Sequence, residues 1–292
     1  MDQVEIRKGI KVFLDKGFNY EESLKSVSIQ HEDVMQLKQQ LEKVSIVPIV
    51  HDKLCLFFLN GCSGNIDDAA KRIERYYQIK TSSPEFFWNR NPESKALQRS
   101  FKVQQMASLP ITPNNYFVFI QRSIDSNSKN FHFDDAFKTF MMMAENALVT
   151  HGPRDGSILI SDWKGTSFGH IFRPSIGSIM KALDYVQNAS PLKTRAVHIL
   201  NSSHLFQTLF SIIKPFMKKE LSDVIHIHTP DLDYNEFFEK YVPRHCMPSD
   251  YGGSLQSFDE LYSKNVETLM SMKEYYYLEE LHCKSRLEKT SL

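Results

Sequence analysis

The sequence contains no apolar run that approaches the roughly 18 residues a bilayer-spanning helix requires. The first residues, Met1 to Arg7, interleave charged and apolar side chains, so they form no apolar secretory leader. The four cysteines follow no C-x-x-C spacing and no dense pairing framework, which is typical of reduced thiols. We therefore expect a cytoplasmic protein. The cysteines are Cys55, Cys62, Cys246 and Cys283.

Neither sign of charge predominates, because 35 Lys and Arg residues balance 35 Asp and Glu residues. A chain with a formal net charge of +0 has no global field that would recruit nucleic acid or an anionic bilayer. Contact with a membrane surface must then depend on a local cluster of side chains. We expect no nucleic-acid partner, and we expect a monomer.

The first third of the chain has helical periodicity. Val34, Leu37, Leu41 and Val44 lie on one face of a 3.6-residue repeat, which predicts an amphipathic helix. Asn65 is a suitable N-cap for a second helix, whose first turn is acidic. Residues 81–95 are rich in Ser, Pro, Asn and charge, which indicates a boundary after an all-helical unit.

From about residue 115 the pattern changes to short apolar runs that alternate with helix-like stretches. The runs at 116–120, 157–160, 195–200 and 224–228 predict strands, and the stretches 131–149, 175–188 and 203–219 predict the crossover helices. This alternation is typical of an α/β layer with a largely parallel sheet. The charged tail after residue 253 is predicted to be helical and to pack back through Tyr275, Tyr276 and Tyr277.

One motif suggests hydrolysis. Residues 165–169 read G-x-S-x-G around Ser167, and Asp223 and His226 follow in the order found in serine hydrolases. Asp162, Trp163 and Lys164 stand between the predicted strand and the first glycine, however, and Asp223 and His226 lie only three residues apart. A loop with glycine turns is the favoured interpretation, and a serine hydrolase that uses Ser167 remains an alternative. We expect no catalytic residues.

Three histidines suggest a metal site. His226 and His228 lie on one face of a predicted strand, and His198 lies on another strand. No carboxylate or thiolate stands at an evident ligand spacing, and hydrogen-bonded structural histidines are common. We therefore expect no metal and no cofactor.

The stretch 203–219 carries an apolar stripe that must be covered. The stripe has four large apolar side chains. If all four were exposed to water, the fold would lose roughly 6–12 kcal/mol of burial free energy, at about 1.5–3 kcal/mol for each side chain. Core, ligand, bilayer or a partner helix are the possible covers, so a protein-interaction scaffold also remains an alternative. The stripe comprises Phe206, Leu209, Phe210 and Ile213.

Four motifs in order and at matching spacing carry a family resemblance. They are the D-W-K-G sequence at 162–165, P-L-K-T-R-A-V-H-I-L-N at 191–201, I-K-P-F at 213–216 and P-S-D-Y-G-G at 248–253. Together they resemble the CRAL-TRIO lipid-transfer family over residues 95–254. Phe58-Leu59 and Asp67-Asp68-Ala69-Ala70 resemble that family's helical leader. Within the family the set is most similar to the α-tocopherol transfer protein and the cellular retinaldehyde-binding protein.

The resemblance implies three segments: a helical N-terminal domain (1–94), a CRAL-TRIO lipid-binding domain (95–254) and a C-terminal helical tail (255–292). It also implies a mixed, largely parallel sheet that floors an apolar cavity, and a mobile helical lid at the stripe. The stripe would then cover ligand when the lid is closed and meet lipid when it is open. The other wall residues implied by position are Phe140, Met143, Ile160, Tyr185, Val186, Leu192 and Val197. Met143 belongs to a run of three methionines that gives a cavity wall adaptability or fills gaps in a core.

Basic residues are implied at the membrane surface. Lys193 and Arg195 match positions where the tocopherol carrier meets phosphoinositide phosphates. Asn60, Glu220 and Val224 replace other basic residues of that cleft, so specific phosphoinositide recognition is not implied by the full pattern. Lys218 and Lys219 offer general attraction to anionic lipid instead.

The function implied by the resemblance is that of a non-enzymatic carrier, cytoplasmic and peripheral at membranes. It would bind one tocopherol-like, retinoid-like or carotenoid-like molecule, with α-tocopherol among the candidates, and move it between membranes by opening the lid. A phospholipid or phosphoinositide transfer protein of the same fold is an alternative. The sequence does not identify the ligand.

Overall fold

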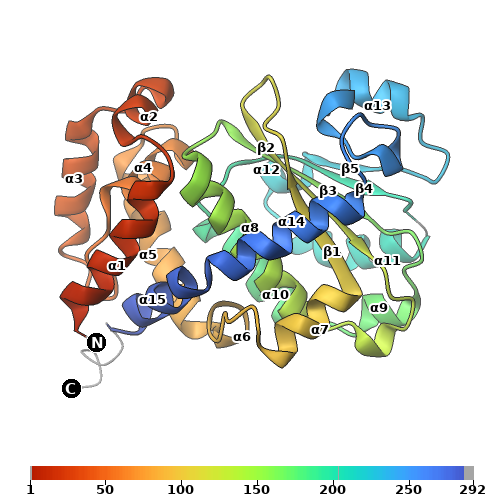
Figure 1. The fold of residues 1–292 in the computed structure, drawn as a ribbon, viewed down its shortest axis with the longest axis horizontal. Helices are drawn as coiled ribbons and strands as arrows, with labels where there is room; N and C mark the ends of the chain where they lie inside the picture. Colours follow the sequence, from red (N-terminus) through yellow and green to blue (C-terminus); the bar gives the residue numbers. More distant parts are fainter. Residues whose placement is uncertain (1, 203, 286–292) are drawn as a thin grey trace.

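Five helices form the N-terminal part of the computed structural model, which describes residues 2–202 and 204–285 (Figure 1). They are α1 (Gln3–Lys16), α2 (Tyr20–Val27), α3 (His31–Leu41), α4 (Asp52–Gly61) and α5 (Ile66–Ser82). Asn65 caps α5 as predicted, because its side chain accepts a hydrogen bond from the Asp68 amide at 3.0 Å. Val34 and Leu37 are buried. The predicted helical N-terminal region is confirmed.

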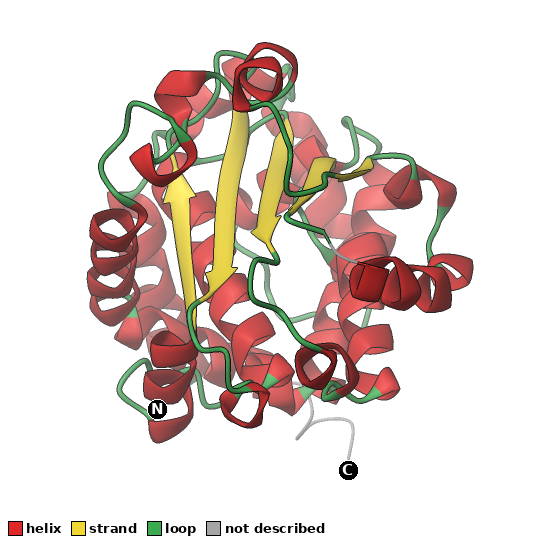
Figure 2. Ribbon diagram, turned by 90° about the vertical axis from the view of Figure 1, so that its right-hand side faces the viewer, coloured by secondary structure: helices red, strands yellow, loops and turns green. Residues whose placement is uncertain are grey.

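A five-stranded mixed sheet follows in the order β1-β2-β3-β4-β5 (Figure 2). Its strands are β1 (Gln104–Leu109), β2 (Tyr116–Ser123), β3 (Gly156–Asp162), β4 (Thr194–Leu200) and β5 (Ile225–Ile227). β1 pairs antiparallel with β2, and the other neighbours are parallel. The crossovers contain α8 (Phe133–His151), α10 (Ile176–Asp184) and α11 (His204–Ile213). The predicted largely parallel α/β layer is confirmed, whereas β1 was not predicted.

Short helical segments occupy many of the connections. They are α6 (Pro84–Phe87), α7 (Lys95–Val103), the 3-10 turn η1 (Ser128–Asn130), α9 (Phe168–Phe172), the π-helical segment η2 (Tyr185–Ala189), η3 (Lys214–Phe216), α12 (Lys219–Ser222), α13 (Tyr234–Lys240), η4 (Arg244–Cys246) and η5 (Ser249–Tyr251). Polar composition indicated a boundary at 81–95, and this stretch also carries aromatic residues. The structure instead buries Phe86, Phe87 and Arg90 from that stretch, because α6 packs against α5 and α8.

The sheet separates two apolar cores. Strand alternation places Phe117, Phe119 and Leu159 on the face covered by α8, whereas Ile158 and Ile160 face α13. The α8-side core is continuous with the N-terminal helices and with the C-terminal helices α14 (Phe258–Ser271) and α15 (Lys273–Lys284). α15 packs along α1 (Figure 1). The beginning and the end of the described chain therefore share one core.

Residues from three of the motifs that carried the resemblance brace the carboxyl end of the sheet. The Asp162 carboxylate accepts hydrogen bonds from Tyr251 Oη at 2.9 Å and from Asn201 Nδ2 at 2.6 Å. Gly252 has a φ of +75°, and a Cβ on Gly253 would lie 1.9 Å from the Met247 carbonyl oxygen. These residues fix the fold and lie outside the cavity described below.

Candidate functional site: an apolar cavity with a charged end

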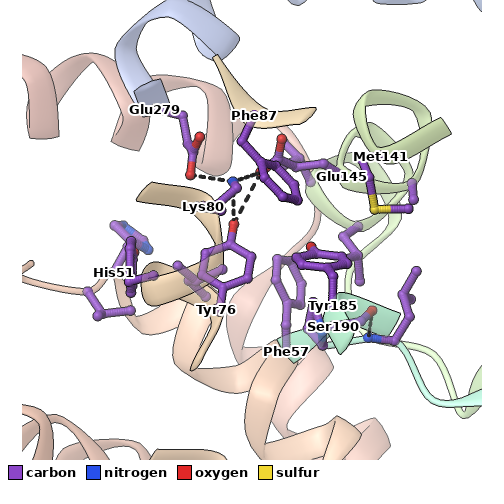
Figure 3. A pocket seen from close by; sticks show the side chains of 18 of the residues that line it. His51, Phe57, Tyr76, Lys80, Phe87, Met141, Glu145, Tyr185, Ser190 and Glu279 are labelled. Carbon is purple, nitrogen blue, oxygen red and sulfur yellow. Dashed lines mark hydrogen bonds and ion pairs between the residues drawn. The ribbon is translucent and has the colours of Figure 1, made fainter. Parts of the chain in front are cut away.

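A cavity of about 410 Å³ lies between the sheet, α8, the N-terminal helices and α15 (Figure 3). This volume is within the range of sites that hold one small organic molecule. Phe119, Leu159 and Val197 contribute its floor from three adjacent strands. The predicted sheet provides this floor, and the walls come from α8 and from helices outside residues 95–254.

One face of α8 forms a wall of the cavity. Met141, Ala144, Glu145 and Leu148 follow the spacing that places side chains on one side of a helix, and all four line the cavity. Three of them are apolar, and Glu145 lies among them. The adaptable methionine of the 141–143 run is therefore Met141.

Four ionisable side chains close the end of the cavity that faces α5 and α15. Lys80 Nζ lies 2.9 Å from Glu145 Oε1 and 2.5 Å from Glu279 Oε1. It also donates to Tyr76 Oη at 2.6 Å, so the ammonium group lies among three oxygens (Figure 3). Arg90 pairs with the second oxygen of both glutamates. We call Lys80, Arg90, Glu145 and Glu279 the charge cluster.

The charge cluster opposes the effect of burial on the charges of Glu279 and Lys80. Burial alone would raise the pKa of the Glu279 carboxyl, but Lys80 and Arg90 outweigh it and lower this pKa well below its usual value. Burial likewise opposes the charge on Lys80, yet the two glutamates raise the pKa of its ammonium group. Two positive and two negative charges leave no net charge at this end of the cavity.

Five of the predicted wall residues line the cavity, namely Phe140, Tyr185, Val186, Leu192 and Val197. Two do not. Ile160 points to the opposite face of the sheet and packs in the α13-side core, because side chains alternate along β3. Met143 is fully buried in the core, because its position on α8 is turned away from the lining face.

The four residues of the predicted lid stripe do not line the cavity. Phe206 is buried, and its ring lies 4.7 Å from that of Trp163, which follows β3. Phe206 also stacks on Phe210 at 5.9 Å, whereas Leu209 and Ile213 are half-buried. In this structure the cavity does not cover the stripe of α11: Phe206 packs on Trp163, and the other three side chains are only partly buried.

The predicted basic residues are exposed and fall into two places. Arg195 Nε donates to the Asp155 carbonyl at 2.8 Å, and Lys193 lies two residues before it on the same strand edge. Lys219 pairs with Asp223. Lys218 instead lines a separate open pocket of about 360 Å³, whose other basic residues are Lys71, Arg72 and Arg75.

One feature of the sequence indicates the charge cluster and was not used in the prediction. On α5 the buried positions Ile73, Tyr76, Tyr77 and Lys80 share one face. A lysine on an otherwise apolar stripe requires a buried partner, since an unpaired buried charge is costly. Its partners lie 65 and 199 residues away, so helix periodicity alone could not identify them.

The residues of the hydrolase alternative are not assembled into a triad. Ser167 caps α9, and its Oγ lies 2.9 Å from His170 Nδ1 in a capping box. His226 stacks on His198 at 5.0 Å between ring centroids. Neither His226 nor Asp223 contacts Ser167, so the local hydrogen bonds of Ser167 are those of a helix start.

The three histidines do meet on the α13 side of the sheet. His198 Nδ1 lies 3.0 Å from His228 Nε2, and Tyr241 packs over the His198 ring at 4.5 Å. Within residues 2–202 and 204–285, no group of three or more His, Cys, Asp or Glu side chains has a geometry that could hold a metal ion. In the same part of the chain, no helix has both the length and the apolar composition needed to cross a membrane.

Comparison with known proteins gives two family matches. Residues 111–253 match the CRAL/TRIO domain, and residues 27–97 match the Pinta-like UBA domain. The crystal structure of Sfh5 superimposes with a TM-score of 0.52 at 11% identity, covering 93% of this chain and 98% of that one. This likeness concerns the fold alone.

Curated relatives are similar over most of the chain. The alpha-tocopherol transfer protein-like protein of Mus musculus is 26% identical over 249 residues, which are 83% of this chain and 70% of that protein. The Homo sapiens protein of the same name is 26% identical and is covered over 66% of its length. Clavesin-1 of Xenopus laevis is 22% identical over 78% of this chain and 69% of its own. The chain thus spans about two thirds of the length of these relatives.

Proposed function

Since residues 111–253 of this chain form a CRAL/TRIO domain, we propose that the protein is a cytoplasmic carrier of one hydrophobic small molecule. The observation that carries the proposal is the cavity of about 410 Å³ on the sheet floor. A tocopherol-like, retinoid-like or carotenoid-like molecule would gain about 25 cal/mol for each Å² of apolar surface that leaves water. No bond is made or broken, because transfer requires only that a membrane offer the ligand another apolar environment.

We also propose that the surface made by α9, α10 and α11 contacts the membrane during transfer. α9 and α11 pack against each other, and together with the neighbouring segments they expose large apolar side chains. These are Phe168 (60% exposed), Phe172 (58%), Ile176 (70%), Ile212 (47%) and Phe216 (56%). Such a cluster is costly in water and favourable at the boundary of a bilayer.

We propose that α11 is the movable lid of the carrier. Phe206 is held by contact with Trp163, while Ile212 on the same helix is exposed. At the adjacent edge of the sheet Ile227 is 37% exposed, so α11 does not seal that edge. Displacement of α11 at a bilayer would exchange the Trp163 contact for contact with lipid.

A phospholipid carrier is a second candidate function. The open pocket formed by Lys71, Arg72, Arg75 and Lys218 gathers four basic residues, with Asp68 as the acidic one. Arg72 donates to the Ser190 carbonyl and Arg75 pairs with Asp184, which leaves the two lysines for an anionic head group. Mass spectrometry of the molecule extracted from the purified protein distinguishes the candidates, because a phospholipid differs in mass and phosphorus content from a chromanol, retinoid or carotenoid.

Filling the cavity tests the carrier function. Val197→Trp should abolish ligand retention, because the indole would project from the floor into the space that the ligand needs. Native mass spectrometry and transfer of a labelled ligand between vesicles measure the effect. Ile124→Trp, at a half-exposed position outside the cavity, is the control. Equal ligand retention by both variants would contradict the proposal.

Removing aromatic side chains from α9 tests the membrane contact. Phe168→Ser together with Phe172→Ser should weaken vesicle adsorption at least about tenfold, since each phenylalanine contributes on the order of 1.5–3 kcal/mol when fully buried in lipid. Val4→Ser together with Val12→Ser removes comparably exposed apolar side chains from α1 and should leave adsorption unchanged. Sedimentation with vesicles measures both. Loss of adsorption in the α1 variant alone would place the contact elsewhere.

A further inference from the structure

The charged end of the cavity also contains tyrosine hydroxyls that the ion pairs do not use. Tyr77, Tyr185 and Tyr275 are buried and line the cavity. None of their hydroxyls forms a hydrogen bond with any residue that the structure describes. We call these three groups the tyrosine hydroxyl set. Tyr76 does not belong to it, because its oxygen accepts the bond from Lys80.

The tyrosine hydroxyl set is accessible from the cavity. Its oxygens are not among the fully enclosed polar atoms that lack a partner in the described residues. Since the rings are buried and the side chains line the cavity, an oxygen that is not enclosed opens into it. A ligand in the cavity is therefore the partner within reach of these hydroxyls. Buried hydroxyls generally have a hydrogen-bond partner.

The hydroxyl set offers neutral donors. Burial raises the pKa of the Tyr185 hydroxyl well above its usual value, and Glu145 and Glu279 raise it further. Burial raises the pKa of Tyr77 and of Tyr275 in the same way. Each hydroxyl therefore stays protonated at physiological pH and can donate a hydrogen bond to an oxygen of the ligand.

No positive charge at this end is free to bind an anion. Each of the three ammonium protons of Lys80 has an acceptor, namely Tyr76 Oη at 2.6 Å, Glu145 Oε1 at 2.9 Å and Glu279 Oε1 at 2.5 Å. Arg90 is paired with both glutamates. A carboxylate or phosphate placed here would meet two glutamates whose counter-charges are already engaged.

We propose that the charged end of the cavity binds a neutral, oxygen-bearing head group, and specifically an alcohol, at the end of a hydrophobic ligand. This inference rests on the proposed carrier function and specifies the chemical class of its ligand. An alcohol oxygen accepts a bond from the tyrosine hydroxyl set and donates its own proton to a glutamate oxygen. A carboxylate accepts but cannot donate, and a hydrocarbon leaves the set unbonded.

Three fluorescent probes with one chain and different ends test the proposal. They are a conjugated octadecatetraenoic acid, the corresponding octadecatetraenol and the octadecatetraene hydrocarbon. For the wild-type protein at pH 7.5 the alcohol should bind most tightly and the carboxylate most weakly. In the variant Y77F/Y185F/Y275F the affinity for the alcohol should fall by about tenfold, because the rings remain and the donors are lost. The affinity for the hydrocarbon should stay the same.

Each single Tyr→Phe variant assigns the loss to one hydroxyl, and Tyr277→Phe on the exposed side of α15 is the matched control. Equal affinity of the wild-type protein for the alcohol and the hydrocarbon would overturn the proposal and leave the carrier function intact. Tightest binding of the carboxylate would have the same two consequences. An equal loss for all three probes in the variant would also overturn it, because it would show a role in shape alone. Failure of the wild-type protein to bind any probe would overturn the carrier function itself.

Discussion

Replacing Arg90 with methionine should lower the free energy of unfolding by about 3–5 kcal/mol. The Arg90 side chain is 1% exposed and pairs with one oxygen each of Glu145 and Glu279. Methionine has a similar length but no charge, so Lys80 alone would then face two buried carboxylates. The loss comes from the uncompensated negative charge as well as from the missing bonds. Urea denaturation at pH 7.5, followed by circular dichroism, measures it.

Two further variants make the expectation specific to the buried charges. Lys240→Met breaks an ion pair with Glu236 in which both side chains are 58% exposed, and it should change stability by less than about 0.5 kcal/mol. Adding Glu279→Gln to Arg90→Met removes the unpaired charge and should restore part of the loss. A loss of under 1 kcal/mol for Arg90→Met would mean that Arg90 is not essential to charge balance in this cluster.

The fold was predictable where apolar periodicity is local. Four strands and their crossover helices follow from runs such as 116–120, and Asn65 marks the start of α5. The sequence did not predict β1, because this strand follows α7 without a break and begins with Gln104 and Gln105. Gln105 is buried there through bonds to Arg122 and Asp259, which only the folded chain brings together. The apolar residues of β1, Met106, Ala107 and Leu109, form too short a pattern after these glutamines to indicate a strand.

The motifs located the family better than the site. The resemblance to the CRAL-TRIO family is confirmed by the match over residues 111–253. The motif at 191–201 contributes Leu192 and Val197 to the cavity, whereas Asp162, Tyr251 and Gly253 of the other motifs brace the sheet and do not line it. Residues that hold a backbone in place make recognisable sequence patterns because few other residues fit. Apolar wall residues are interchangeable in kind, so they leave a weaker pattern.

The site combines segments that no local pattern connects. Lys80 and Glu279 are 199 residues apart and form one ion pair at the end of the cavity. Among the positions taken from the resemblance, Phe140 and Val197 lie on the cavity lining, whereas the resemblance assigned no wall to α1, α5 or α15. The reason is physical: the cavity lies where the N-terminal and C-terminal helices close over the sheet, and this closure is a tertiary event.

Lowering the pH from 7 to 5 should destabilise the protein through the histidines on the α13 side of the sheet. Burial, and then His226 and His228, lower the pKa of His198 to about 3. In the unfolded chain an ordinary histidine titrates near 6.5, so between these values the unfolded state binds a proton that the folded state does not. Stability is therefore lost as the pH falls below about 6.5. His198 alone accounts for about 2 kcal/mol at pH 5.

His198→Phe isolates this contribution, because phenylalanine can occupy the space between Phe237 and Tyr241 without titrating. Its free energy of unfolding should fall by about 2 kcal/mol less than that of the wild-type protein over the same pH interval. The exposed His245, replaced by phenylalanine, is the control. Urea titrations at pH 7, 6 and 5 provide the comparison. Glu279 does not interfere, because it takes up a proton only below this pH interval. Identical pH dependence in the wild-type protein and His198→Phe would contradict the prediction, because it would show that burial does not keep the His198 imidazole neutral.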